Sequence, residues 1–282
     1  MDSTSQRQKA FIFLMLAALL WSTGGLMIKI TDWQPISIVA GRCMFSVIVL
    51  LIYLRRFPTH WTRWKMVAAA AHILTSFLFV ASTKLTTAAN AIFLQYTAPI
   101  YIVLLGIWFL KEHPSRTDWS SMAIIFVGMA LFFGDKLSLN GLEGSLLAVL
   151  SGLSLAIMTV ALRAQKEGMP AESILIGQLF MAVAGIPSVM KESWTLRNWL
   201  IILYLGVFQI GIAFIFFTSA IKHVPAIEAT LISTLEPVLN PVWVFLFIGE
   251  EPGRFALLGG LIVLAGVVLN AVGGARVQPE PA

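Results

Sequence analysis

Two ionisable residues lie inside long apolar stretches of the sequence, where a charge is costly. Arg42 lies about seven residues into an apolar run that begins at Pro35, and Glu236 lies deeper in the run 226–248. An ionisable side chain in such surroundings usually faces water or a partner of opposite charge. Arg42 can bind a carboxylate, and Glu236 can bind an ammonium group or carry a proton. Arg42 can instead extend to the nearer surface or pair with a neighbouring helix.

Polar and aromatic side chains recur at helical spacing in two further apolar runs. They are His72, Ser76 and Phe79 in the run 66–83, and Asn90, Phe93, Thr97 and Tyr101 in the run 88–110. At 100° per residue each set falls on one side of a helix, as expected for the wall of a polar path. The same side chains can instead hydrogen-bond neighbouring helices, at roughly 0.6–2 kcal/mol each. The pattern leaves both interpretations open.

Other candidates for such a wall occur singly along the chain. Asn240 and Trp243 follow Glu236 in the same run, and Trp21 precedes a pair of glycines. Gln178 and Gln209 are amides inside two later apolar runs. Each of these residues can line a path or simply hold helices together.

Three prolines lie inside apolar runs where a helix must be interrupted. Pro99 and Pro237 each remove the hydrogen bond to the carbonyl group four residues earlier, which predicts a kink in both runs. Pro241 predicts a second break in the later run. Interrupted helices inside a membrane are tolerated where they line a cavity or where neighbours satisfy the freed groups. These prolines are therefore candidate hinges, although they can also serve packing alone.

An apolar composition determines the elements that must position these residues. Apolar and aromatic residues make up 58% of the 282 residues and charged residues 12%, against about 25% charged in soluble domains. So few charges cannot cover a water-soluble protein of this size, so the lipid bilayer is the expected solvent. Ten apolar runs are long enough to cross it. They are 10–30, 35–54, 66–83, 88–110, 117–134, 142–162, 171–190, 199–220, 226–248 and 255–274.

Continuous runs of this length in hydrocarbon must be helices, because the backbone finds no other hydrogen-bond partners there. We therefore expect an all-α integral membrane protein with ten transmembrane helices. Twelve Lys and Arg residues lie on the side of the N-terminus and six on the other side. By the positive-inside rule both termini are cytoplasmic. The run 10–30 is too long for a signal-peptide core and is expected to be retained.

The sequence lacks the signals of several other functions. Cys43 is the only cysteine, which excludes an intramolecular disulfide and a cysteine-based zinc site. Neither H-E-x-x-H nor G-x-S-x-G occurs, so an intramembrane enzyme is a remote alternative. The net charge of +5 comes without a basic patch interleaved with aromatic residues, so no nucleic-acid partner is expected.

The second half of the chain repeats the first, at an offset of 138 residues from Lys84 onward and of 131 near the start of each half. The offset of 138 residues superposes Lys84 on Lys222, Pro99 on Pro237, Glu112 on Glu250, Arg116 on Arg254 and Gly128 on Gly266. We expect two five-helix repeats, 1–136 and 137–276, and a disordered tail over 277–282. Because five is odd, the second copy enters the bilayer from the opposite side. Inverted repeats give two nearly equivalent conformations that open to opposite sides, the basis of alternating access.

Three glutamates have a structural interpretation. Glu112 and Glu250 are each followed by a proline two residues later, and we expect them to stabilise the N-terminus of the next helix. Glu228 lies near the start of its run and is expected to cap the helix or pair with Lys222.

These features resemble the EamA family of the drug/metabolite transporter superfamily. The resemblance rests on the five-plus-five organisation, on residues 95–99 followed by Phe-Leu-Lys-Glu-His-Pro at 109–114, and on the echo at 235–237 and 247–252. The chain looks most like the YddG-type exporters, which carry aromatic and other amino acids out of bacterial cells. The resemblance implies an inner-membrane carrier of a small-molecule substrate that works without a cofactor. Lys111 departs from the family, where a glycine usually precedes the glutamate.

Other members of the superfamily carry other solutes, such as a drug-like cation, a nucleobase or a sugar-phosphate. A phosphate-bearing substrate requires several cationic side chains facing the cavity. Only Arg42 lies well inside an apolar run, which favours a zwitterionic or neutral substrate.

Overall fold

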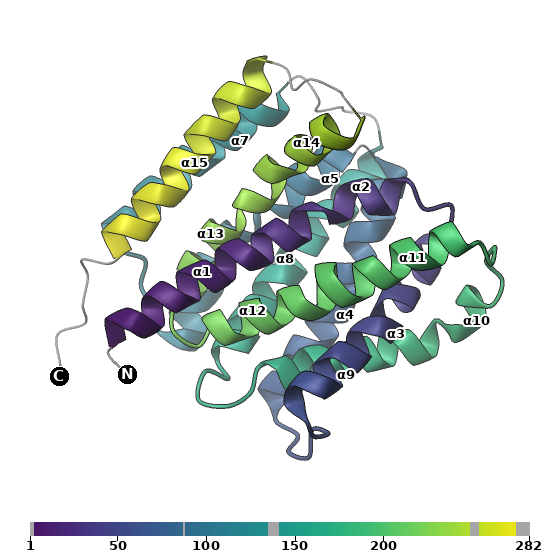
Figure 1. Ribbon diagram of the computed structural model, residues 1–282. Coiled ribbons are helices and arrows are strands. Elements are labelled where there is room, and N and C mark those ends of the chain that lie inside the picture. Colours follow the sequence, from purple (N-terminus) through teal and green to yellow (C-terminus); the bar gives the residue numbers. More distant parts are fainter. Residues whose placement is uncertain (1–2, 87, 135–140, 249–253, 275–282) are drawn as a thin grey trace.

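The computed structural model describes residues 3–86, 88–134, 141–248 and 254–274. Within these ranges every regular element is helical and no strand occurs, so the prediction of an all-helical protein is confirmed. The helices lie side by side and most of their ends gather at two opposite edges of the molecule (Figure 1). The predicted tail, 277–282, and Glu250 lie outside the described residues.

The first half of the chain contains shorter helices than the apolar runs suggest. Its elements are α1 (Ser3–Ser22), α2 (Gly24–Lys29), α3 (Pro35–Leu54), α4 (Arg63–Leu85), α5 (Ala88–Gln95), α6 (Ala98–Leu105), the π-helical segment η1 (Gly106–Leu110) and α7 (Arg116–Phe133). The run 10–30, predicted as one helix, is divided at Thr23, before two glycines that weaken a helix. At the start of α7, Ser115 and Asp118 form a capping box, which fixes where that helix begins.

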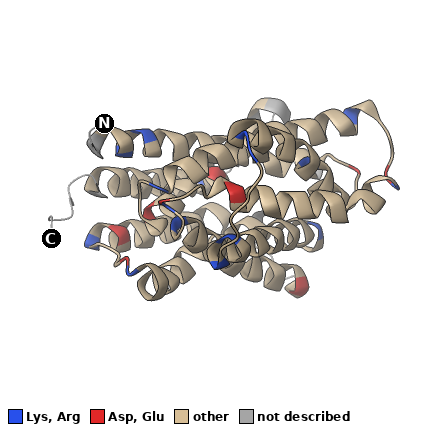
Figure 2. Cartoon of the chain, turned by 90° about the horizontal axis from the view of Figure 1, so that it is seen from below, with Lys and Arg blue, Asp and Glu red and all other residues tan. Residues whose placement is uncertain are grey.

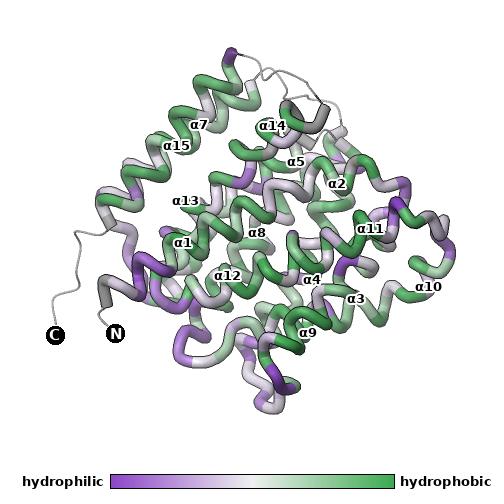
Figure 3. The backbone as a smooth tube through the Cα atoms, viewed as in Figure 1, coloured by the Kyte–Doolittle hydropathy of each residue, from purple (hydrophilic) through white to green (hydrophobic). Residues whose placement is uncertain are grey.

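The second half of the chain also contains helices that are shorter than the apolar runs. Its elements are α8 (Leu142–Arg163), α9 (Ala171–Ala184), α10 (Ile186–Val189), α11 (Leu196–Tyr204), the π-helical segment η2 (Leu205–Ile212), α12 (Ala213–Ala220), α13 (Ala226–Ser233), α14 (Leu235–Ile248) and α15 (Arg254–Gly274). Figure 3 shows that the helices are mainly hydrophobic and that hydrophilic residues gather near their ends. Figure 2 shows long stretches of helix without Lys, Arg, Asp or Glu.

Seven helices in the described ranges are long and apolar enough to cross a membrane. They are Ser5–Ile28, Pro35–Leu54, Arg63–Leu85, Ala91–Leu110, Leu142–Arg163, Leu196–Ala220 and Arg254–Gly273. The other three predicted runs correspond to α7, to α9 with α10, and to α13 with α14. α9 is an apolar helix of 14 residues, and α13 and α14 are separated at Thr234. The chain is therefore a multi-pass membrane protein.

The two halves are interrupted at equivalent positions. The offset that superposes Pro99 on Pro237 also superposes both ends of α5 on those of α13. Each proline then lies in the first turn of the following helix, where its missing N–H costs no intrahelical hydrogen bond. Both runs are therefore broken near these prolines, as predicted. The second break predicted at Pro241 is not seen, because α14 is continuous across that position.

A first group of ion pairs joins the two halves at the start of α9. The Glu172 carboxylate, 5% exposed, forms ion pairs with Arg56 at 3.1 Å and with Lys65. Glu172 belongs to the second half, whereas Arg56 lies in the connection between α3 and α4 and Lys65 lies in the first turn of α4. A buried carboxylate requires such partners, so this contact ties α9 to the first half.

A second group surrounds the connection between α12 and α13. Arg7 of α1 pairs with Glu228 of α13 at 2.6 Å, and Arg163 of α8 pairs with Glu112 at 2.7 Å. Glu228 therefore pairs with Arg7 and not with Lys222 as predicted. Glu112 accepts a hydrogen bond from the backbone N–H of Ala226, the first residue of α13, at 3.1 Å. It thus stabilises the N-terminus of α13 rather than that of α7, which Ser115 and Asp118 already cap.

The equivalent helices α7 and α15 pack closely through glycines. A Cβ atom at Gly259 would lie 2.4 Å from the backbone nitrogen of Phe132, and one at Gly128 would lie 2.8 Å from that of Val263. Helices inside a membrane approach each other most closely where their contacting residues are small. The contact between α7 and α15 therefore depends on glycine, which has no Cβ atom, at these two positions.

We predict that Gly259→Ala destabilises the protein, because its methyl group collides with the backbone of α7. The matched control is Gly260→Ala, whose nearest neighbour is a Val238 side-chain methyl at 3.3 Å. Overpacking of this kind costs about 1–3 kcal/mol. The melting temperature of the purified protein in detergent should fall for Gly259→Ala and change much less for Gly260→Ala. Equal melting temperatures for the two variants would contradict the described packing.

Candidate functional site

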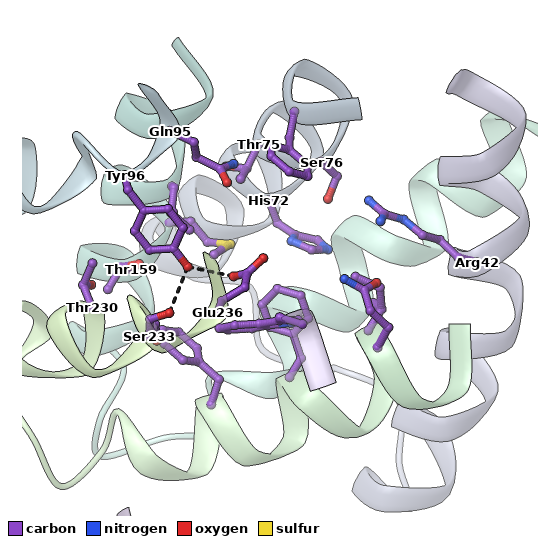
Figure 4. Close-up of a pocket in the computed structure, with 18 residues that line it drawn as sticks. Arg42, His72, Thr75, Ser76, Gln95, Tyr96, Thr159, Thr230, Ser233 and Glu236 are labelled. Atoms are coloured by element: carbon purple, nitrogen blue, oxygen red, sulfur yellow. Dashed lines mark hydrogen bonds between the residues drawn. The ribbon is translucent and has the colours of Figure 1, made fainter. Parts of the chain in front are cut away.

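A cavity of about 100 Å³, partly open to solvent, lies between the two halves. Its walls come from α1, α3, α4, α5, α8, η2, α12, α13 and α14. Figure 4 shows polar side chains from several of these helices directed toward one another. Because both halves contribute, a relative movement of the halves changes the shape of this cavity.

The interrupted run at Pro237 creates one polar end of the cavity. Proline has no N–H, so Pro237 leaves the carbonyl group of Ser233 without its usual helical partner. The hydroxyl of Tyr96 lies 2.9 Å from that carbonyl oxygen and 2.8 Å from Oε2 of Glu236, and donates to these acceptors (Figure 4). Tyr96 lies within the equivalent break in the first half, between α5 and α6. The two interruptions therefore meet through a tyrosine–glutamate contact.

The freed carbonyl at the other interruption is accommodated differently. Pro99 cannot bond the carbonyl of Gln95, and a Cβ atom at Gly152 of α8 would lie 2.6 Å from that oxygen. The Gln95 side chain donates to Ser151 Oγ at 2.7 Å, and Ser151 donates to the Thr75 carbonyl at 3.1 Å. These bonds fix α5 against α4 and α8 and place Gln95 on the cavity wall.

Another part of the wall contains polar atoms without partners. The Arg42 side chain reaches toward His72 and Ser76 (Figure 4), and Arg42 is 4% exposed. Among the described residues, Arg42 Nε, His72 Nε2 and Gln209 Oε1 are buried without a hydrogen-bond partner. Gln209 lies in the π-helical segment η2, and π-helical turns occur frequently at functional sites.

Aromatic rings form the apolar part of the wall. The ring of Trp21 lies 5.4 Å from that of Phe214 and 5.2 Å from that of Phe217, between centroids. The His72 imidazole meets Phe214 edge-on at 4.8 Å. Such rings offer a large apolar surface with few rotatable bonds, which suits a solute with an apolar side chain.

The structure brings half of the sequence-predicted wall residues to this cavity. They are Trp21, Arg42, His72, Ser76, Phe79, Gln209 and Glu236. The side chains of Asn90, Asn240 and Pro241 lie outside the described residues.

The remaining predicted residues make other contacts. Phe93 packs against Phe133 at 6.0 Å, Thr97 donates to the Leu94 carbonyl, and Tyr101 is half-buried against the hydrophobic core. Gln178 is fully buried in α9, away from the cavity wall. Trp243 donates to Ser22 Oγ at 2.8 Å. Of the stripe predicted for the run 88–110, the described members Phe93, Thr97 and Tyr101 are thus not among the residues that line this cavity.

Sequence reasoning missed Gln95 and Tyr96, which line the cavity in place of that stripe. The prediction assumed one helical phase through the run, whereas α5 ends at Gln95 and α6 begins at Ala98. The break can change the direction of Thr97 and Tyr101, which lie beyond it. Phe93 and Gln95 both belong to α5 and lie about 200° apart around it, so there the prediction selected the opposite face of the helix. The signal was present in Pro99, because a proline places the freed carbonyl group four residues earlier, beside these two residues.

The family model described as the EamA-like transporter family matches this chain twice, over residues 8–134 and 142–272. An uncharacterized transporter of Archaeoglobus fulgidus is 23% identical over 91% of this chain and 94% of its own. The uncharacterized transporter YxxF of Bacillus subtilis is 24% identical over 99% of this chain and 95% of its own. YdfC of the same organism, another uncharacterized transporter, is 31% identical over 65% of this chain and 62% of its own.

One solved crystal structure has the same fold. It covers 96% of this chain and 100% of its own with a TM-score of 0.82, at 20% sequence identity. At this level of identity the similarity concerns the fold.

We predict that Tyr96→Phe destabilises the protein, because the Ser233 carbonyl and Glu236 lose their donor. Leaving a buried acceptor unsatisfied costs about 1–3 kcal/mol. Tyr101→Phe is the control, since no hydrogen bond of the Tyr101 hydroxyl occurs among the described residues. Thermal unfolding in detergent should show a lower melting temperature only for Tyr96→Phe. A Tyr96→Phe protein as stable as the parent would show that the hydrogen bonds of the Tyr96 hydroxyl do not stabilise the fold.

Proposed function

The chain belongs to the EamA-like transporter family of the drug/metabolite transporter superfamily, and from this membership we propose that it exports amino acids, aromatic ones included, by alternating access. The observation that carries the proposal is the cavity between the halves. Its wall combines a buried arginine, a half-buried glutamate and aromatic rings. A zwitterion with an apolar side chain matches all three features. This would make the chain similar in activity to the YddG-type exporters.

We further propose that the protein crosses the membrane ten times as two inverted five-helix repeats. The seven long spans, α7, the pair α9 and α10 and the pair α13 and α14 would supply the crossings. The equivalent interruptions before Pro99 and Pro237 support a duplicated unit. The ion pairs support the inversion, because Arg7 near the start of α1 and Arg163 at the end of α8 both reach the α12–α13 connection.

Alternating access requires contacts that close one side and can separate. All four ion pairs seen in the described ranges link the first half to the second. The helix ends that carry them lie toward the edge of the molecule where the N-terminus lies (Figure 1). In this proposal the ion pairs hold that side closed and separate when the cavity opens toward it. Water then replaces the lost partners, which limits the free-energy difference between the two states.

We propose that both termini are in the cytoplasm and that the protein resides in the cell inner membrane. In a Cys43→Ala background, a membrane-impermeant maleimide should label Lys191→Cys in intact cells and Lys166→Cys only after lysis. Both positions are exposed and follow α10 and α8, respectively. Labelling of Lys166→Cys in intact cells would show the opposite orientation, with this connection outside the cell.

The transport proposal is tested with purified protein in proteoliposomes. Labelled phenylalanine should cross the membrane, whereas a sugar-phosphate, a nucleobase and a quaternary cation should not. The phosphate compound is disfavoured because Arg42 is the one cation on the described cavity wall. Transport of one of the other solutes in place of phenylalanine would contradict the proposed substrate, and the proposal that the protein is a carrier would stand.

A filled cavity should stop this transport. Ser76→Phe places a ring in the cavity, whereas Ser120→Phe adds the same ring on an exposed face of α7. We predict that uptake falls to background in Ser76→Phe and is retained in Ser120→Phe, with equal amounts of protein reconstituted. Unchanged uptake in Ser76→Phe would show that the substrate does not pass through this cavity.

A further inference from the structure

Arg42 differs from the other buried cations of the molecule. Lys65 and Arg163, whose side chains are each 11% exposed, form ion pairs with Glu172 and Glu112. Arg42 is 4% exposed, and it makes no ion pair or hydrogen bond with any described residue. Lys65 and Arg163 are thus neutralised, whereas Arg42 has no counter-ion in the part of the chain that the structure describes.

An uncompensated buried charge is expensive. Removing one partner of a buried pair destabilises a protein by about 3–5 kcal/mol, because the remaining charge is left unpaired. Buried polar atoms without partners are rare, and each requires an explanation, such as a ligand. Arg42 lines the cavity, so the missing anion has a place to bind.

The carboxylate on the same cavity does not neutralise Arg42. Glu236 receives the Tyr96 hydroxyl at 2.8 Å, and it forms no ion pair with Arg42 in the described structure. Figure 4 shows Glu236 beside Tyr96, whereas Arg42 comes from α3 on the other side of His72. The two charges are therefore separate features of the wall.

The neighbours of Arg42 are suited to an organic anion. The guanidinium group can donate two parallel hydrogen bonds to a carboxylate. The hydroxyl of Ser76 and the imidazole of His72 lie beside it and can donate further (Figure 4), and His72 Nε2 has no partner of its own. The rings of Phe214 and Trp21 continue the wall from His72, so an apolar group attached to the anion would find an apolar surface.

We infer that Arg42, with His72 and Ser76, forms a subsite that binds the carboxylate group of the transported metabolite. This inference rests on the proposed transport function and names the chemical group that the substrate must carry. Binding neutralises the arginine, so the substrate supplies the counter-ion that no described residue provides. Compounds that keep the apolar group and lose the carboxylate should bind poorly.

Three related probes separate the groups of the substrate. Phenylalanine carries both charges, 3-phenylpropionate keeps only the carboxylate, and phenethylamine keeps only the ammonium group. Binding to the purified protein in detergent is measured by calorimetry. We expect 3-phenylpropionate and phenylalanine to bind and phenethylamine to bind at least about tenfold more weakly, as expected for loss of a charge-assisted pair.

Arg42→Gln should weaken binding of the two carboxylates by about tenfold or more and leave phenethylamine unchanged. Arg42→Lys keeps the charge without the two-pronged geometry and should retain partial affinity, which keeps the test valid if Arg42→Gln does not fold. Arg197→Gln, at an exposed position, is the control and should bind like the parent. Phenylalanine binding in Arg42→Gln or Arg42→Lys equal to the parent would overturn the inference.

The outcomes separate this inference from the proposed function. Transport of phenylalanine with the same affinity in the parent and in Arg42→Gln would keep the amino-acid carrier and overturn the subsite. Arg42-dependent binding of 3-phenylpropionate without transport of any amino acid would keep the subsite and overturn the amino-acid proposal. Displacement of bound carboxylate by chloride at similar concentration would also overturn the subsite, because it would then accept any small anion.

Discussion

The cost of leaving a charge unpaired in apolar surroundings shapes this molecule more than any other interaction. The chain meets this cost by pairing carboxylates of one half with cations of the other. Glu172 binds Arg56 and Lys65, and Glu228 binds Arg7. These contacts hold two halves of one chain together at a single end of the bundle. Because the partners belong to different halves, the ion pairs can separate without unfolding either half.

The second determinant is the pair of prolines at equivalent positions. Neither has an N–H to bond the carbonyl group four residues earlier. The Ser233 carbonyl accepts a hydrogen bond from the hydroxyl of Tyr96, and the Gln95 carbonyl lies close to Gly152 of α8. A continuous helix would hide these polar groups. The interruptions instead direct them toward the centre of the bundle. A duplicated unit thus provides a cavity at its own junction, and Arg42 enters that cavity from another helix.

Much of the fold could be predicted, because apolar runs, prolines and the repeat between the halves are local or periodic signals. Breaks inside the runs were harder: the helix divided at Thr23 and the continuity of α14 through Pro241 depend on packing. Of the site, single polar residues inside apolar runs, such as Arg42, were found because their burial is costly wherever they face. Tyr96 was missed because helical phase changes at a break. The partners of Glu112 and Glu228 lie far away in the sequence, and only tertiary contact reveals them.

The central claim is that the halves separate at the ion-paired end during transport. The most direct measurement is the distance between spin labels at Thr59→Cys and Lys166→Cys, in a Cys43→Ala background in lipid nanodiscs, by pulsed electron paramagnetic resonance. Both positions are exposed, lie in connections near the ion pairs and belong to different halves. The account predicts that Glu172→Gln combined with Glu228→Gln shifts the distance distribution to longer values. A distribution identical to that of the labelled parent would contradict it.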